Sequence, residues 1–124
     1  MIASIIIRAY NAQATIARAL SSALAQDLSE PYEVIVVDDG STDNTTSIVE
    51  RLSDARVRII KQENKGAAAA ANTGFKSVVG EIAVLLDADD EALPIMLSAA
   101  VPLLEDPNLA YTYPDYYEEY KGSR

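Results

Sequence analysis

The feature that most constrains this chain is the regular alternation of short apolar runs with segments of helical spacing. Strands that are buried on both faces are nearly continuous apolar runs. The apolar runs of this chain are therefore predicted to be strands of a parallel sheet. Alternating strands and helices predict an α/β fold with a mostly parallel sheet, covered by helices on both faces and joined by right-handed crossovers. The first four predicted strands are residues 4–7, 33–38, 57–60 and 81–86.

The segments between these strands have the spacing and start signals of helices. No linker, repeat or low-complexity tract interrupts the pattern, so residues 1–124 are expected to form a single domain. The second helix has Ser41, Thr42 or Asp43 as its expected N-cap. The predicted helices are residues 14–26, about 44–52, 66–79 and 94–104, and a fifth strand is predicted at 109–113.

Composition excludes several functions. The net charge of −9 argues against nucleic acid or an anionic membrane surface as the main partner, but a phosphate can still be bound locally. There is no His and no Cys, so any chemistry must use carboxylates, backbone amides or a hard cation. No apolar run approaches the roughly 20 residues of a membrane-spanning helix. The N-terminus lacks the basic region of a signal peptide, which predicts a cytoplasmic location.

The sequence VLLDADD places three carboxylates directly after a predicted strand. In an extended conformation, Asp87 and Asp89 project to the same side while Ala88 faces away. Two oxygen ligands on one side suit Mg²⁺ or Mn²⁺, which could bridge a diphosphate and neutralise a departing phosphate. The alternative is helix capping, since Asp89 and Asp90 precede a predicted helix.

A second pair of acids, Asp38 and Asp39, ends another predicted strand and is followed by Gly40. Ligands of such sheets bind outside the carboxyl ends of the strands, where these acids would lie. Their carboxylates could accept hydrogen bonds from a ribose or from the N–H of a base. The alternative is a polar turn in which the acids cap residues 41–44.

Two further segments are candidates for the same edge. Lys65 and Gly66 open a predicted helix, whose N-terminal amides could bind an anion; the alternative is that the Ala run and Gly74 serve close helix–sheet packing. Tyr10 and Asn11 could lie against a planar base. For Tyr10, the alternative is a side chain in the core.

Taken together, four segments resemble the family 2 inverting glycosyltransferases: SIIIRAYNAQATIARAL, EVIVVDDGSTDNT, VRIIKQENKGAAAAANTG and GEIAVLLDADD. The resemblance runs from residue 4 to about residue 117. It implies the Rossmann-like GT-A fold, a three-layer α/β architecture that binds nucleotide-diphosphate sugars. The chain departs from the usual family pattern at Arg8, where Pro is common, and within residues 68–71, where Ser and Arg are common.

The resemblance also implies roles for individual residues. Ala9, Tyr10 and Asn11 resemble the first-strand end that lines the nucleotide pocket. Asp39, with Asp38 beside it, resembles the carboxylate that reads a uridine-type base. The motif Asp87-Ala88-Asp89 resembles the D-x-D, with Asp89 the expected metal ligand and Asp87 nearer the donor sugar. The nucleotide-sugar set therefore comprises Ala9, Tyr10, Asn11, Asp38, Asp39, Lys65, Gly66, Asp87 and Ala88, and the metal set comprises Asp89 and Asp87.

The implied function is transfer of a sugar, with inversion, from a nucleotide-diphosphate sugar to an acceptor hydroxyl in cell-wall or polysaccharide biosynthesis. Mg²⁺ or Mn²⁺ is the implied cofactor. The catalytic base is expected in an acceptor half downstream, so residues 1–124 are expected to supply the donor site only. The acceptor (glycan, lipid or protein) is left open. Attachment at the inner membrane face and self-association are compatible with the sequence, and the alternative function is a non-catalytic nucleotide-binding or assembly module.

A phosphoacceptor signalling domain also clusters Asp residues at strand ends. It carries an Asp pair after its first strand, whereas the acids here follow the second and fourth predicted strands. The sequence therefore disfavours that class.

Overall fold

The computed structural model describes residues 2–104, which form four strands alternating with four helices. The predicted fifth strand, residues 109–113, lies outside the described residues. The elements are β1 (Ala3–Ala9), α1 (Ile16–Leu24), β2 (Tyr32–Asp38), α2 (Thr45–Leu52), β3 (Val57–Lys61), α3 (Ala67–Lys76), β4 (Ile82–Asp87) and α4 (Met96–Leu104).

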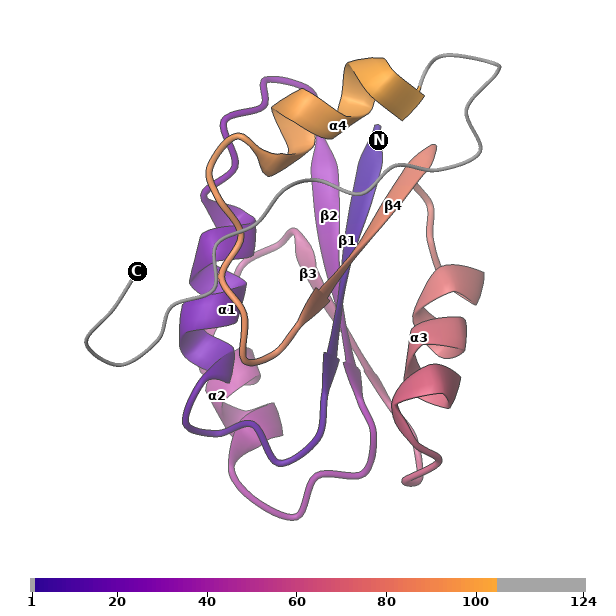
Figure 1. Ribbon diagram of the computed structural model, residues 1–124. Coiled ribbons are helices and arrows are strands. Elements are labelled where there is room, and N and C mark those ends of the chain that lie inside the picture. The colour runs from indigo at the N-terminus through magenta and orange to yellow at the C-terminus, as the bar shows by residue number, and fades with distance from the viewer. Residues whose placement is uncertain (1, 105–124) are drawn as a thin grey trace, which may run out of the picture.

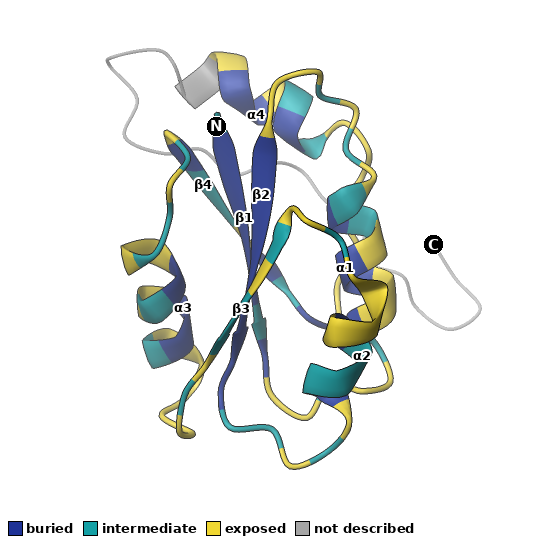
Figure 2. Ribbon diagram, turned by 180° about the vertical axis from the view of Figure 1, so that it is seen from behind, coloured by how far each residue is buried: buried dark blue, intermediate teal, exposed yellow. Residues whose placement is uncertain are grey.

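The strands form one sheet in the order β3-β2-β1-β4, and each neighbouring pair is parallel. The two central strands, β1 and β2, are buried almost throughout, as Figure 2 shows. Apolar runs without alternation are expected of strands with both faces covered. The predicted parallel α/β fold is therefore confirmed.

Helices cover the sheet on both sides (Figure 1). On one side, alternate residues of the central strands, such as Ile5 and Val34, share a core with Leu20 of α1, Val49 of α2 and Leu97 of α4. On the other side, the intervening residues Ile6, Ile35 and Val37 pack with Ala70 of α3. The sheet is thus the middle of three layers.

Small residues allow α3 to lie close to the sheet. A Cβ atom added at Gly74 would lie 2.4 Å from Cγ2 of Ile6, which is fully buried on β1. Ala70 and Ala71 are also buried. Close packing, the alternative explanation of this Ala-rich segment, is therefore confirmed.

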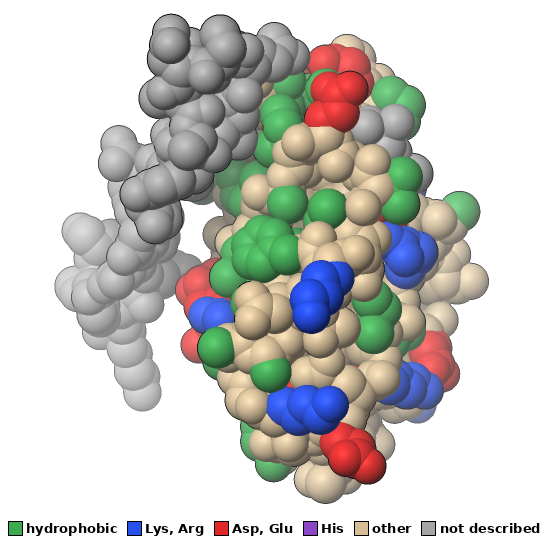
Figure 3. Space-filling view, turned by 90° about the vertical axis from the view of Figure 1, so that its right-hand side faces the viewer, with side chains coloured by type: hydrophobic (Ala, Val, Ile, Leu, Met, Phe, Trp, Pro, Cys, Tyr) green, Lys and Arg blue, Asp and Glu red, His purple; other side chains and the backbone are tan. Residues whose placement is uncertain are grey.

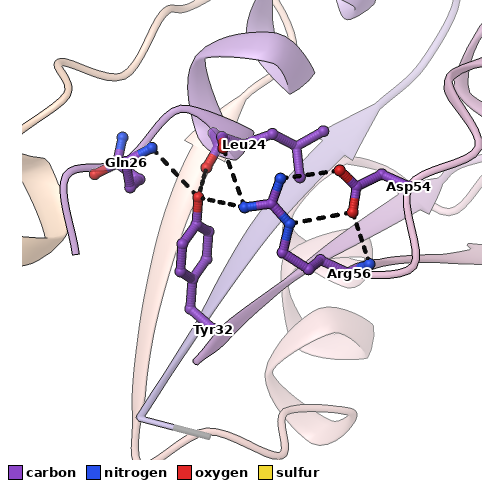
Figure 4. A network of polar contacts seen from close by, with 6 residues as sticks. Leu24, Gln26, Tyr32, Asp54 and Arg56 are labelled. Atoms are coloured by element: carbon purple, nitrogen blue, oxygen red, sulfur yellow. Dashed lines mark hydrogen bonds and ion pairs between the residues drawn. The ribbon is translucent and has the colours of Figure 1, made fainter. Parts of the chain in front are cut away.

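The amino ends of the strands are held by polar networks. Figure 4 shows one of them: the Arg56 guanidinium pairs with Asp54 at 2.9 Å and donates to the Tyr32 hydroxyl and the Leu24 carbonyl, each at 3.1 Å. The Tyr32 hydroxyl in turn donates to the Ala23 carbonyl. These contacts fix the end of α1 against the starts of β2 and β3.

A second network centres on Glu33, which is 3% exposed. Its carboxylate accepts hydrogen bonds from Ser4 Oγ at 2.7 Å, from Arg58 Nε at 2.9 Å and from the Val79 amide at 3.1 Å. Burial raises the pKa of Glu33, but these hydrogen bonds outweigh burial and hold the pKa below its ordinary value. A buried carboxylate thereby joins β1, β2, β3 and the loop before β4.

The helices begin later than the sequence predicts. α2 starts at Thr45 with Asn44 as N-cap, not after one of the residues at 41–43. α4 starts at Met96, after a turn in which the Met96 amide donates to the Leu93 carbonyl. Ser41 and Thr42 instead contact the loop after β1, as described below, whereas Asp43 accepts a hydrogen bond from the amide of Thr45, the first residue of α2, at 3.0 Å.

β4, like β3, is an edge strand of the described sheet, and β4 pairs with β1 only. Leu85 of β4, Val79 of the loop before it and Phe75 of α3 are among the exposed large apolar side chains. Figure 3 shows this side of the molecule, where hydrophobic side chains lie among basic ones. Within residues 2–104, no helix has both the length and the apolar character needed to cross a membrane.

Candidate functional site

The carboxyl ends of the strands meet at one edge of the sheet. In the strand register Ala9 lies opposite Asp38, and Arg8 lies opposite Asp87. The segments 8–11, 38–40 and 87–90 therefore border the same edge, which we call the carboxyl-end rim. This juxtaposition was predicted from the sequence and is confirmed.

The loops after β1 and β2 are bound to each other along the carboxyl-end rim. Asn11 adopts a φ of 48°, a left-handed conformation that Asn tolerates better than most residues. Its amide donates to Ser41 Oγ at 2.9 Å, and its side-chain oxygen accepts from the Thr42 amide at 2.8 Å. Ser41 and Thr42, expected as caps of α2, thus fix the loop after β1.

Tyr10 precedes this contact and is 51% exposed. The alternative interpretation of Tyr10 as a core residue is wrong, because β1 ends at Ala9 and half of Tyr10 is exposed to solvent. An exposed aromatic ring at the rim can contact a planar ligand.

Asp38 is buried and serves the turn after β2. Its carboxylate accepts from the Ser41 amide at 3.3 Å and from the Thr46 hydroxyl at 3.1 Å. For this residue the turn-capping alternative is confirmed. Gly40 permits the turn with a φ of 79°, and a Cβ there would lie 2.8 Å from the Asn64 nitrogen.

Asp39 is 3% exposed and accepts three hydrogen bonds from the segment before α3. The donors are Gln62 Nε2 at 2.9 Å, the Lys65 amide at 2.8 Å and the Gly66 amide at 2.9 Å. Burial raises the pKa of Asp39, but these bonds and the Lys65 charge hold it below the ordinary value. The carboxylate therefore remains ionised at neutral pH.

These bonds revise one expectation. The amides of Lys65 and Gly66 do bind an anion, as the sequence predicted, but that anion is the carboxylate of Asp39. Gln62 was missed by the sequence analysis, although it links Asp39 to the Thr73 hydroxyl, which donates to Gln62 Oε1 at 2.6 Å. A single Gln after a strand carries no sequence signal of such a role.

Three carboxylates gather after β4 and form what we call the acidic cluster: Asp87, Asp89 and Asp90. One oxygen from each lies within 4.8 Å of the others. The strand ends at Asp87, and the Asp90 amide donates to the Asp87 carbonyl at 3.0 Å. The predicted extended conformation through Asp89 is therefore wrong: a turn gathers the acids and adds Asp90, which was not among the predicted ligands.

Ala88 and α4 complete the picture of this turn. Ala88 is 7% exposed and packs in the core, so it faces away from the acids as predicted. Helix capping by Asp89 or Asp90 is wrong, because α4 begins only at Met96, after an intervening loop.

Arg8 meets the acidic cluster from the neighbouring strand. Its Nε donates to Asp87 Oδ1 at 2.7 Å, and its Nη1 lies 3.4 Å from the Ala67 carbonyl oxygen in the first turn of α3. The side chains of Arg8 and Asp87 are 28% and 43% exposed. The carboxyl end of β1 thus brings one positive charge to the acidic cluster.

The carboxyl-end rim can hold a hard cation and a polar ligand. The acidic cluster offers only carboxylate oxygens, the donor type that Mg²⁺ and Mn²⁺ prefer. The guanidinium of Arg8 lies on the adjacent strand β1, and the exposed ring of Tyr10 follows directly after that strand. A parallel sheet between two layers of helices, with acids at its carboxyl-end rim, is the architecture expected of the Rossmann-like GT-A fold.

Comparison with known proteins identifies the family. The pattern of glycosyl transferase family 2 matches residues 4–124. The chain therefore belongs to this family. It is 38% identical over 117 residues to the Escherichia coli UDP-Glc:alpha-D-GlcNAc-diphosphoundecaprenol beta-1,3-glucosyltransferase WfaP, a match that covers 94% of the chain and 46% of WfaP.

Solved structures give the same fold. The mannosyltransferase PcManGT from Pyrobaculum calidifontis, in complex with GDP-Man and Mn²⁺, matches with a TM-score of 0.78 and 34% identity, over 86% of this chain and 33% of its own. S. aureus TarS in complex with UDP-GlcNAc matches with a TM-score of 0.76 and 31% identity, over 86% of this chain and 32% of its own. The chain thus spans less than half the length of these relatives.

Proposed function

We propose that this chain is the donor-binding part of an inverting glycosyltransferase that takes its sugar from a nucleotide-diphosphate sugar of the UDP type. The observation that carries the proposal is the acidic cluster at the carboxyl-end rim of a GT-A sheet. The related structures bound to UDP-GlcNAc and GDP-Man, and the UDP-Glc in the name of WfaP, support a nucleotide sugar as the donor.

Asp89 and Asp87, joined by Asp90, would hold Mg²⁺ or Mn²⁺. The fit rests on three oxygen donors within 4.8 Å of one another and on the absence of His and Cys from the whole sequence. When bound, such an ion would neutralise the charge of the departing nucleoside diphosphate. The Mn²⁺ in the PcManGT complex supports this choice of cation.

The remaining rim residues would bind the nucleotide. Tyr10 would stack on the base, and the main chain of Ala9 and Asn11 would border it. Asp39 would accept a hydrogen bond from the base N–H, using carboxylate lone pairs that its bonds to Gln62, Lys65 and Gly66 leave unoccupied. Asp38, Lys65, Gly66 and Ala88 would shape the pocket through the turns that they hold.

In the complete enzyme, a carboxylate would remove the proton of the acceptor hydroxyl as that oxygen attacks the anomeric carbon. We place this base in an acceptor half beyond the donor site. A glycan, lipid or protein acceptor in polysaccharide biosynthesis is proposed, and the diphosphoundecaprenol in the name of WfaP supports a carrier at the inner membrane face. Cytoplasmic location and self-association stay predictions.

Calorimetric titration of UDP and of UDP-sugars, with Mn²⁺ and with chelator, tests the proposal. We expect binding that requires Mn²⁺ and that Asp89→Asn abolishes. Asp27→Asn is the matched control, because Asp27 is exposed and its carboxylate has no hydrogen bond or ion pair within residues 2–104. Binding that is the same in Asp89→Asn and in the unchanged chain would refute the metal assignment.

A non-catalytic nucleotide-binding or assembly module is the second candidate. The observation that favours it is the ion pair of Arg8 with Asp87, which satisfies one acid of the cluster from within the chain. The test uses a chain extended to the length of its relatives. This alternative would be supported if that chain binds the nucleotide but shows neither sugar transfer nor Asp89-dependent hydrolysis of the nucleotide sugar.

A further inference from the structure

Arg8 stands at a position from which it can serve two different ligands. It lies on β1, opposite Asp87 of β4 in the strand register, and its Nε–Asp87 Oδ1 contact is 2.7 Å. Its second contact, to the Ala67 carbonyl, is long at 3.4 Å. The guanidinium therefore lies between the acidic cluster and the start of α3.

The guanidinium is only partly used in this arrangement. A guanidinium carries five N–H donors in a planar fork that matches the oxygens of carboxylates and phosphates. Beyond the bonds to Asp87 and Ala67, the N–H groups of Arg8 have no partner among residues 2–104. Because the side chain is 28% exposed, these free donors lie within reach of a ligand.

The charges around Arg8 define what that ligand would be. The acidic cluster brings three carboxylates together, and Arg8 pairs with one of them. An ion pair in which both side chains are partly exposed contributes little to stability, so its partners can exchange. A diphosphate that arrives with a divalent cation can replace both halves of this ion pair. Arg8 would then bind phosphate oxygens, and Asp87 would bind the cation.

We propose that Arg8 binds the diphosphate of the donor and that, before the donor arrives, it occupies Asp87 as an internal counter-ion. The proposal rests on the function proposed above and adds a residue to that site. Arg8 thereby lowers the affinity of the acidic cluster for a free divalent cation and raises the affinity for a cation that carries a diphosphate. The site then selects the complete metal–diphosphate complex over the bare ion.

The test compares the unchanged chain with the variants Arg8→Met and Arg8→Lys. Met keeps an unbranched apolar stem without the charge, and Lys keeps the charge without the fork. Arg51→Met is the matched control, since it removes the same charge from an exposed position at the end of α2 whose side chain has no hydrogen bond or ion pair within residues 2–104. Calorimetry measures three affinities in each chain: Mn²⁺ alone, pyrophosphate with Mn²⁺, and UDP with Mn²⁺.

The expected result has opposite signs in two titrations. Arg8→Met binds Mn²⁺ alone more tightly than the unchanged chain, and binds pyrophosphate and UDP about tenfold more weakly, because charge-assisted hydrogen bonds are lost. Arg8→Lys falls between the two for pyrophosphate. Arg51→Met matches the unchanged chain, and thermal unfolding verifies that each variant is folded.

Two outcomes overturn the proposal and remain distinct from failure of the proposed function. If Arg8→Met binds Mn²⁺ as tightly as the unchanged chain does, and also binds pyrophosphate as tightly, then Arg8 is a purely structural residue, even if UDP binds. Weaker binding of both Mn²⁺ alone and pyrophosphate in Arg8→Met would also refute the counter-ion role. Arg8-dependent binding of pyrophosphate in a chain that binds no nucleotide would uphold Arg8 and refute the proposed donor.

Discussion

Replacing Asp39 by Asn should destabilise the domain, because Asp39 organises the approach to α3 from within the candidate site. Its carboxylate takes three hydrogen bonds, two on Oδ1 from Gln62 and Lys65 and one on Oδ2 from Gly66. Asn keeps one oxygen and replaces the other with an NH₂ group. At best it retains the bonds of Oδ1 and sets its NH₂ against the Gly66 amide.

The size of the effect follows from these contacts. A hydrogen bond to a charged group contributes about 1.5–3 kcal/mol, and leaving a buried donor unpaired costs about 1–3 kcal/mol. Gly66 is exposed, so water can reach its amide and the lower part of this range applies. We expect Asp39→Asn to lower the free energy of unfolding by about 2 kcal/mol at pH 7.

Urea unfolding of both chains measures this difference in the free energy of unfolding. We expect the m-value to be unchanged, and Asp27→Asn serves as the control variant. The pKa of Asp39 is lowered in the folded chain, so its contribution is complete above the unfolded pKa of about 3.9 and is lost as the pH falls through the folded pKa. The gap between the two chains should therefore narrow only below about pH 4. A gap under about 0.5 kcal/mol at pH 7, the usual range for surface substitutions, would refute this account of Asp39.

Three further predictions concern stability. Glu33→Gln should lower the free energy of unfolding by about 2 kcal/mol, because Arg58 loses its charged partner and Glu33 is almost completely buried. Urea titration measures this loss, which should become smaller in acid because the pKa of Glu33 is lowered in the folded chain. Gly74→Ala should destabilise by about 1–2 kcal/mol despite the better helix propensity of Ala, because its Cβ would press on Ile6; a higher melting temperature than the unchanged chain would contradict this. Mn²⁺ at a hundred times its dissociation constant should stabilise the fold by about 2.7 kcal/mol, and a melting temperature indifferent to Mn²⁺, with and without nucleotide, would count against the acidic cluster as its site.

The sequence by itself determined the strands, the helices and the position of the acids. These follow from local properties: apolar runs must be buried, helical spacing needs a sheet to pack on, and strands of a parallel sheet end at one edge. Asp38, Asp39, Asp87 and Asp89 therefore came to the carboxyl-end rim as predicted. Helix starts were less certain, because a polar residue before a helix can bind either that helix or a neighbouring loop.

Only the tertiary structure decided which donor meets which acid. Arg8 and Asp87 are 79 positions apart, and Asp39 and Gly66 are 27 apart, so nothing in the local pattern joins them. Strand register sets the first pair, and the path of the loop before α3 sets the second. The turn at Asp87–Asp90 likewise depends on Ala88 finding a place in the core. A carboxylate's partners, and hence its freedom to bind a ligand, depend on distances that only the folded chain fixes.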